Sequence, residues 1–226
     1  MSSRLHWLEV SLGSTTVQSV VDYLLSTRYS SASPNGFRVH AVTDEVLEAT
    51  HHQRVYWEEV VEDPAGETYT IKRVRIISTN FILHSRRGLN LLLIDPPRTV
   101  VPMLTDLSLR FTELSSSKRM TDTRRWIEQI HQRAKVLRHE LYSYSNIRVG
   151  ETMVSHAVSV VGEHDLRSGP LEVHFADSSP KAIRFSMELS GQTAAVEIFS
   201  DCRANILSGD SQAVRAVLSD ALAGAR

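Results

Sequence analysis

The chain has a single cysteine and no long hydrophobic run. Cys202 has no second cysteine to pair with, so a disulfide within the chain is excluded, and a lone thiol is typical of a reducing compartment such as the nucleus or the cytosol. The densest apolar run, Leu89 to Ile94, is too short to cross a bilayer. With 226 residues and 42% hydrophobic content, the chain can still bury a substantial core. We therefore expect a folded intracellular protein that does not enter a membrane.

The chain also lacks the short motifs of the common catalytic sites, having no Gly-x-Ser-x-Gly turn, P-loop or glycine-rich dinucleotide turn. Ten histidines raise the question of a metal, but zinc needs three or four converging ligands. His131 and His139 lie about two turns apart in an expected helix, with no further ligand at a useful spacing. Glu163, His164 and Asp165 could place an acid beside a base, so a hydrolase stays a third possibility. We expect no enzyme, no metal and no cofactor.

Charge is segregated along the chain, although the formal net charge is only -1. Residues 1–71 hold four Arg/Lys against ten Asp/Glu, residues 72–148 hold fifteen against six, and residues 149–226 hold six against ten. This layout favours a basic surface patch that attracts acidic partners or polyanions. The same residues could instead pair with the acidic flanks of their own chain. Nucleic acid is also open, although no helix-turn-helix or RNA-binding signature frames them.

Basic residues of an expected turn, linker and helix are our candidates for partner binding. They are Arg86, Arg87, Lys118, Arg119, Arg124, Arg125, Arg133 and Arg138. We expect them to be exposed together, so that reversing their charges weakens partner binding and leaves the fold intact.

Apolar residues spaced three and four apart predict four helices. Ser14 or Thr15 can cap the first, Asp95 the second, and Asp210 the last. The four helices are expected at Val17 to Leu25, at Pro96 to Phe111, at Thr121 to Leu141 and at Val214 to Leu222.

Alternating apolar and polar residues predict antiparallel strands in both halves of the chain. The acidic turn from Glu62 to Glu67 joins two such stretches into a hairpin, and Ser85 to Gly88 joins a second pair. Three later strands are expected at Leu171 to Phe175, Ile183 to Leu189 and Ala194 to Ile198.

These elements predict an α+β protein that is predominantly antiparallel β, with a barrel-like or strongly curved sheet flanked by helices. It would be a single domain, 1–226, or two pseudo-equivalent halves, 1–114 and 118–226, around the serine-rich linker at residues 115–117.

Three stretches of the chain carry a resemblance to a known family. Leu8 to Val20 is an expected strand and a glycine that lead into a helix. Asn80 to Asp95 is an expected strand, turn and strand, and in Leu141 to Gly150 a Tyr-x-Tyr strand runs into Val-Gly. In these stretches the chain resembles subunit 20 of the Mediator head module and, nearly as well, its related partner, subunit 18. The acidic turn and residues 178–203 depart from the family pattern.

The resemblance implies a non-enzymatic nuclear subunit of a transcription coregulator that acts with RNA polymerase II. In this family two structurally related β-barrel subunits pair, and one of them holds a helix of a third subunit. Other protein subunits are therefore the expected partners, with weak nucleic-acid contact as a further possibility. The alternative to this function is a nucleic-acid-binding protein that uses the basic segment, 72–148, and the alternative location is the cytoplasm.

Overall fold

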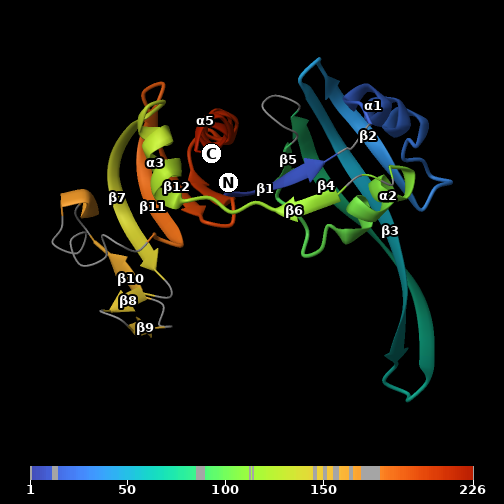
Figure 1. The fold of residues 1–226 in the computed structure, drawn as a ribbon. Coiled ribbons are helices and arrows are strands. Elements are labelled where there is room, and N and C mark those ends of the chain that lie inside the picture. The colour runs from blue at the N-terminus through green and yellow to red at the C-terminus, as the bar shows by residue number, and fades with distance from the viewer. Residues whose placement is uncertain are drawn as a thin grey trace. The chain divides into compact units, whose positions relative to one another are not determined.

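The computed structural model describes residues 2–11, 15–84, 90–111, 113, 115–144, 147–149, 152–154, 158–162, 165–168 and 179–225. The chain divides into two compact units (Figure 1). We call residues 9–117 the arm unit, and residues 1–8 together with 118–226 the C-terminal unit. The division after Ser117 lies at the serine-rich segment, but the first eight residues belong with the second half of the chain.

The arm unit is a curled antiparallel sheet with two helices, in the strand order β1-β5-β4-β3-β2. Strand β1 begins before this unit, and strand β6 ends one residue after it. Its elements are β1 (Ser3–Ser11), α1 (Val17–Ser26), β2 (Asn35–Val42), β3 (Val46–Glu62), β4 (Thr68–His84), β5 (Asn90–Ile94), α2 (Val101–Arg110) and β6 (Ser115–Lys118).

The C-terminal unit has the strand order β10-β7-β11-β12-β13-β1, with a separate pair, β8 and β9. Residues Ser3 to His6 of β1 pair with β13. Its further elements are α3 (Thr123–His131), β7 (Lys135–Tyr144), β8 (Ile147–Val149), β9 (Thr152–Val154), β10 (Val158–Val161), the 3₁₀ helix η1 (Leu166–Ser168), β11 (Ala182–Leu189), β12 (Gln192–Phe199), β13 (Arg203–Ser208) and α5 (Ser211–Gly224).

The expected fold class is confirmed. The chain is α+β, the strand pairs whose register is described are antiparallel, and the sheet is curled without closing into a barrel. The hairpin between β11 and β12 shows how the sequence achieves this pairing. Ser190 and Gly191 form its two-residue turn with φ angles of 50° and 77°, the left-handed backbone that suits the twist of antiparallel strands.

Two helix predictions are wrong in their extent. Helix α2 begins at Val101 and not at Pro96. Asp95 has a φ angle of 46°, which is not helical, and the two prolines that follow it disfavour a helical conformation in the residue before each of them. The helix expected to continue to Leu141 ends at His131, and the chain returns as strand β7. Strand pairing with β10 and β11 outweighs the helical spacing of its apolar residues.

Smaller corrections concern caps and the linker. Thr16 caps α1 through its hydroxyl, Asp122 caps α3, and Asp210 caps α5 as expected. The serine-rich segment is strand β6, paired with β1, and not a loop. Residues 85–89 and 169–178, with the expected Arg86-Arg87 turn and the strand at Leu171 to Phe175, lie outside the described residues.

A partly buried polar cluster ties α1, α2 and the sheet of the arm unit together around Asp106. His51, buried on β3, donates from Nε2 to the Asp106 carboxylate at 2.8 Å. Burial lowers the pKa of His51 more than the carboxylate raises it, so the imidazole is neutral at pH 7. Asn35 also donates to this carboxylate, and the Tyr23 hydroxyl donates to the Asp106 carbonyl. One α2 residue therefore fixes three other elements.

Replacing Asp106 with Ala should lower the free energy of unfolding by about 1–3 kcal/mol, because the buried His51 N–H would lose its acceptor. Asp106→Asn keeps an acceptor oxygen and should lose less. Urea denaturation of the three proteins measures the difference, and an Ala variant as stable as the wild type would contradict this role.

Candidate interaction surface

Strands β3 and β4 pair over 17 residues each and extend beyond the rest of the sheet. Strand β2 stops pairing with β3 at Gln53, and β5 stops pairing with β4 at Asn80. From Arg54↔Ile76 to Glu62↔Thr68 the two strands pair only with each other among the described residues. We call residues 54–76 the arm (Figure 1). At about 3.4 Å per residue, its nine paired positions span about 30 Å.

The arm concentrates the exposed apolar side chains of the protein. It carries seven of the fourteen large hydrophobic residues that are exposed in the described part of the chain. Those seven are Tyr56, Trp57, Val60, Tyr69, Ile71, Val74 and Ile76. Monomeric proteins rarely expose apolar residues in such a cluster, which instead marks a binding surface.

The register divides these residues between two faces, because side chains alternate along a strand and cross-strand partners share a face. One face carries Tyr56 opposite Val74, Arg54 opposite Ile76, and Val60. We call Tyr56, Val60, Val74 and Ile76 the arm face. Their side chains are between 53% and 69% exposed.

The opposite face of the arm is better covered by its own side chains. Trp57, Tyr69 and Ile71 are 37% to 47% exposed. Arg73 there pairs with Glu59 at 2.8 Å. The Tyr69 hydroxyl lies within hydrogen-bond distance of the Asp63 and Glu67 carboxylates, at 2.9 and 3.0 Å. The arm face therefore remains the larger uncovered apolar surface.

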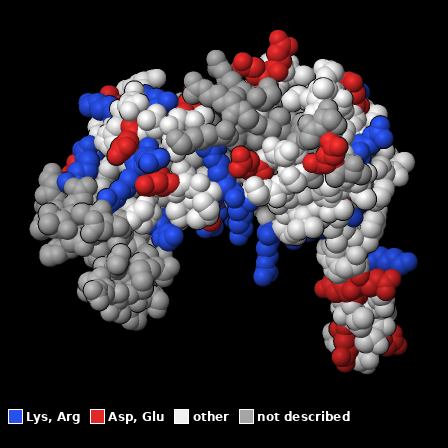
Figure 2. All heavy atoms as spheres, in the orientation of Figure 1, with Lys and Arg blue, Asp and Glu red and all other residues white. Residues whose placement is uncertain are grey.

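The far end of the arm is acidic, as Figure 2 shows. Glu62, Asp63 and Glu67 lie at or beside its turn, and Asp63 accepts bonds from the backbone of Ala65 and Glu67. These bonds lower the pKa of Asp63.

A pocket of about 760 Å³ lies at the base of the arm, within the arm unit. Tyr29 forms one wall. A β-carbon on Gly36 would lie 2.5 Å from the Tyr29 Cα, so only glycine lets this segment cross so close to β2. The full lining is Leu25, Arg28, Tyr29, Phe37, Arg38, Val39, His52, Ile76 and Ser78.

The polar wall of the pocket is held by contacts behind it. The Tyr29 ring lies 4.8 Å from the His52 ring, and His52 Nδ1 lies 2.9 Å from the Ser78 hydroxyl. Arg54 donates to the Tyr29 hydroxyl and to the Ser31 carbonyl. The guanidinium of Arg54 is thus occupied within the chain, and the Tyr29 segment is fixed.

Two arginines in the pocket are not occupied in this way. Among the described residues, neither Arg28 nor Arg38 has an ion-pair or hydrogen-bond partner for its side chain. Burial lowers the pKa of His52, and the charge of Arg38 lowers it further, so His52 is neutral at pH 7. The pocket therefore presents two cationic groups beside an apolar floor.

The basic residues expected to form an interaction surface differ in exposure. Lys118 and Arg125 are exposed, and Arg124 is half-buried. Arg119 is buried and donates to the Leu222 carbonyl, so the expectation that it is exposed is wrong. A guanidinium can satisfy the free carbonyl groups at the end of a helix, here α5.

Two more of the expected basic residues make contacts within the chain. Arg133 donates to the backbone and side chain of Gln129, and Arg138 pairs with Glu140 at 3.0 Å. Arg86 and Arg87 lie outside the described residues. Partner binding by this basic set stays a prediction.

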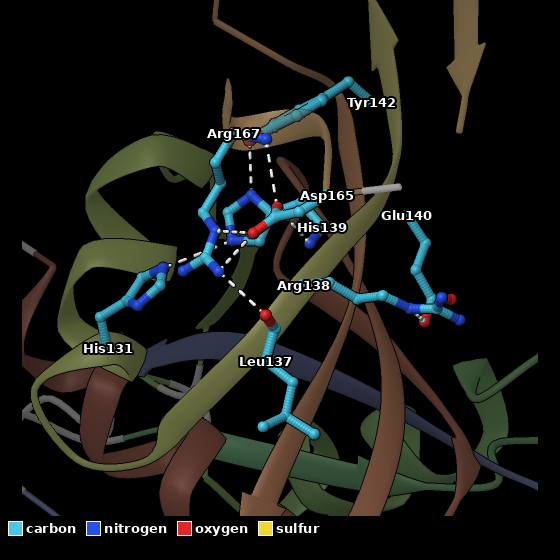
Figure 3. Close-up of polar contacts among 8 residues, drawn as sticks. All are labelled: His131, Leu137, Arg138, His139, Glu140, Tyr142, Asp165 and Arg167. Atoms are coloured by element: carbon cyan, nitrogen blue, oxygen red, sulfur yellow. Dashed lines mark hydrogen bonds and ion pairs between the residues drawn. The ribbon is translucent and has the colours of Figure 1, made fainter. Parts of the chain in front are cut away.

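A polar cluster beside β7 brings His131 at the end of α3 and the Asp165–Arg167 pair close to His139 on β7 (Figure 3). The Nε2 atoms of His131 and His139 lie 3.3 Å apart, because α3 ends at His131 and β7 turns back beside it. The Nδ1 atom of His139 faces the Tyr142 hydroxyl. Among the described residues, no three His, Cys, Asp or Glu side chains are grouped so that they could hold a metal ion.

Asp165 anchors this cluster and does not act as a free base. It accepts bonds from the His139 backbone and from Arg167 Nε, at 3.0 and 2.7 Å, while Arg167 also donates to the Leu137 carbonyl. The Arg167 bond holds the pKa of Asp165 well below its usual range. Glu163 and His164 lie outside the described residues. Asp165, which is the member of the hydrolase hypothesis within the described residues, therefore has a structural role.

No protein-family model matches this chain, and no curated protein matches it significantly. The resemblance to the Mediator head subunits thus depends on the three stretches that carry it. Within the described residues, no helix is long and apolar enough to cross a membrane.

The pH dependence of stability should reveal the buried His139. Burial lowers its pKa to about 4, and the neighbouring His131 and Arg167 contribute. Below pH 6.5 the unfolded chain takes up a proton here that the folded chain resists until about pH 4. The free energy of unfolding should therefore fall as the pH falls through this window, by up to about 3 kcal/mol from this residue.

The matched control is His139→Gln, which removes this contribution and keeps the other histidines. Its stability should fall less than that of the wild type between pH 6.5 and pH 4, as measured by urea denaturation. A His139 resonance that titrates near pH 6.5 in NMR would contradict the prediction.

Proposed function

We propose that this protein is a non-enzymatic protein-interaction subunit that docks onto a larger assembly through the arm face. The observation that carries the proposal is the exposed apolar row on a projecting two-stranded ribbon. The assembly that the resemblance favours is the Mediator head, a nuclear coregulator that acts with RNA polymerase II.

The arm gains little stability from its own unit. A two-stranded ribbon is marginal in water because neither of its faces is covered. Fully burying one large apolar side chain contributes about 1.5–3 kcal/mol. A partner that covers Tyr56, Val60, Val74 and Ile76 would therefore gain several kcal/mol and stabilise the ribbon as well.

The arm favours a partner on its face over one on its edges. An open strand edge is a template for adding another strand, and charged side chains along an edge oppose that addition. The arm strands carry Glu58, Glu59, Lys72, Arg73 and Arg75. Side-chain packing on the arm face is thus the expected mode of contact.

Affinity purification of the full-length protein from its own cells tests the function. We expect it to recover other protein subunits in fixed ratio, with transcription components among them. Recovery without any transcription component would remove the Mediator assignment, and recovery of the protein alone would remove the interaction function.

Variants of the arm face test the surface. Tyr56→Thr, Val60→Thr and Val74→Thr together keep residues suited to strands while removing apolar surface. We expect the recovered subunits to fall at least tenfold, with an unchanged thermal midpoint. The control is Val61→Thr with Ile71→Thr on the opposite face, which should retain them. Equal loss in both proteins would contradict binding through the arm face.

A further inference from the structure

The pocket and the arm face lie on the same face of the β3–β4 pair. The register aligns Gly36 with His52 and His52 with Ser78, and two residues further along it aligns Arg54 with Ile76. Two residues beyond those come Tyr56 and Val74. Steps of two keep side chains on one face of a strand. Ile76 belongs to both the pocket and the arm face, so the two form one continuous surface.

We propose that the pocket binds a carboxylate side chain of the partner, whose neighbouring apolar residues lie on the arm face. The inference rests on the proposed function and names the chemistry of the partner: a protein segment in which Asp or Glu adjoins apolar residues.

Charge complementarity supports a carboxylate. Arg28 and Arg38 both line the pocket and have no partner within the described residues. A guanidinium presents paired N–H donors that match a carboxylate, and such charge-assisted bonds are among the strong ones. Ile76, which is exposed and also lines the pocket, can contact the aliphatic stem of the acidic side chain.

The wall is preorganised, which reduces the entropy lost on binding. Tyr29 is held against Gly36 and His52, and Arg54 fixes its hydroxyl. Arg28 and Arg38 therefore extend from a rigid frame.

The charges along the arm favour a protein over a lipid surface or a nucleic acid. Glu58 lies on the same face beyond Tyr56 with Lys72 opposite it, and Glu62, Asp63 and Glu67 mark the far end. A polyanion following the arm outward from the pocket would meet the carboxylates of this acidic end. A protein segment can place its acidic residue at the pocket and apolar residues beyond it.

Selection from a phage-displayed library of random peptides on the purified full-length protein tests the inference. Enriched peptides should contain Asp or Glu beside apolar residues. They should bind Arg28→Glu/Arg38→Glu at least tenfold more weakly than the wild type in fluorescence polarisation. Arg98→Glu/Arg110→Glu reverses two exposed arginines of the same unit outside the pocket; it is the matched charge control and should bind as the wild type does. Arg38→Lys should retain part of the affinity.

Several outcomes would overturn the inference. They are enrichment of peptides without acidic residues, equal binding to the charge-reversed variant, and no enrichment at all. Binding to phosphatidylserine vesicles that the charge reversal abolishes would assign the pocket to a lipid headgroup instead. A dimer that the reversal disperses would assign it to a second copy of the chain.

The two proposals fail separately. Loss of the cellular partners in the arm-face variant, with full recovery by the charge-reversed variant, leaves the interaction function in place and removes the acidic partner. A circular-dichroism melt of each variant shows that it is folded, so weaker binding can be attributed to the lost surface.

Discussion

The arm unit depends on the unbroken register between β3 and β4. Seventeen cross-strand pairs give both strands a constant alternation, so one shift would exchange every inward and outward side chain. Near β2 this alternation buries Leu47, Ala49 and His51, and it leaves Thr50 and His52 on the other face. Further out, the same alternation creates the arm face. Core, pocket and arm are therefore three consequences of one ladder.

Most of the elements could be predicted from the sequence, because their signals are local. Alternation identified β11 and β12, and the acidic turn identified the β3–β4 hairpin. The helix boundary at His131 could not be predicted, because the pairing that makes Lys135–Tyr144 a strand comes from β11, whose paired residues lie 39 to 53 positions later. His131 and His139 came together for the same reason.

The candidate site was mostly missed, although one signal was present. A strand with one wet face alternates, yet Val55, Tyr56 and Trp57 are consecutive, as are Val60 and Val61. Apolar residues at both parities indicate a strand without a single buried face. Net charge instead predicted an interaction surface within residues 72–148. Composition does not reveal that Arg119 is buried or that Arg138 pairs with Glu140. The pocket of Arg28 and Arg38 could not be predicted, because it forms where the Tyr29 segment crosses close to Gly36, and this close approach is visible only in the structure.

The β1–β13 pair joins segments that are far apart in the sequence. Ser3 to His6 pair with Arg203 to Ile206, about two hundred residues later, so their hydrogen bonds can form only when both segments are present. Trp7 likewise packs against Trp126, with ring centroids 5.5 Å apart, and donates to Ser219 on α5. Contacts this distant in sequence slow folding. The C-terminal unit can therefore complete its sheet only once β13 is present, whereas pairing among β2, β3, β4 and β5 does not depend on β13.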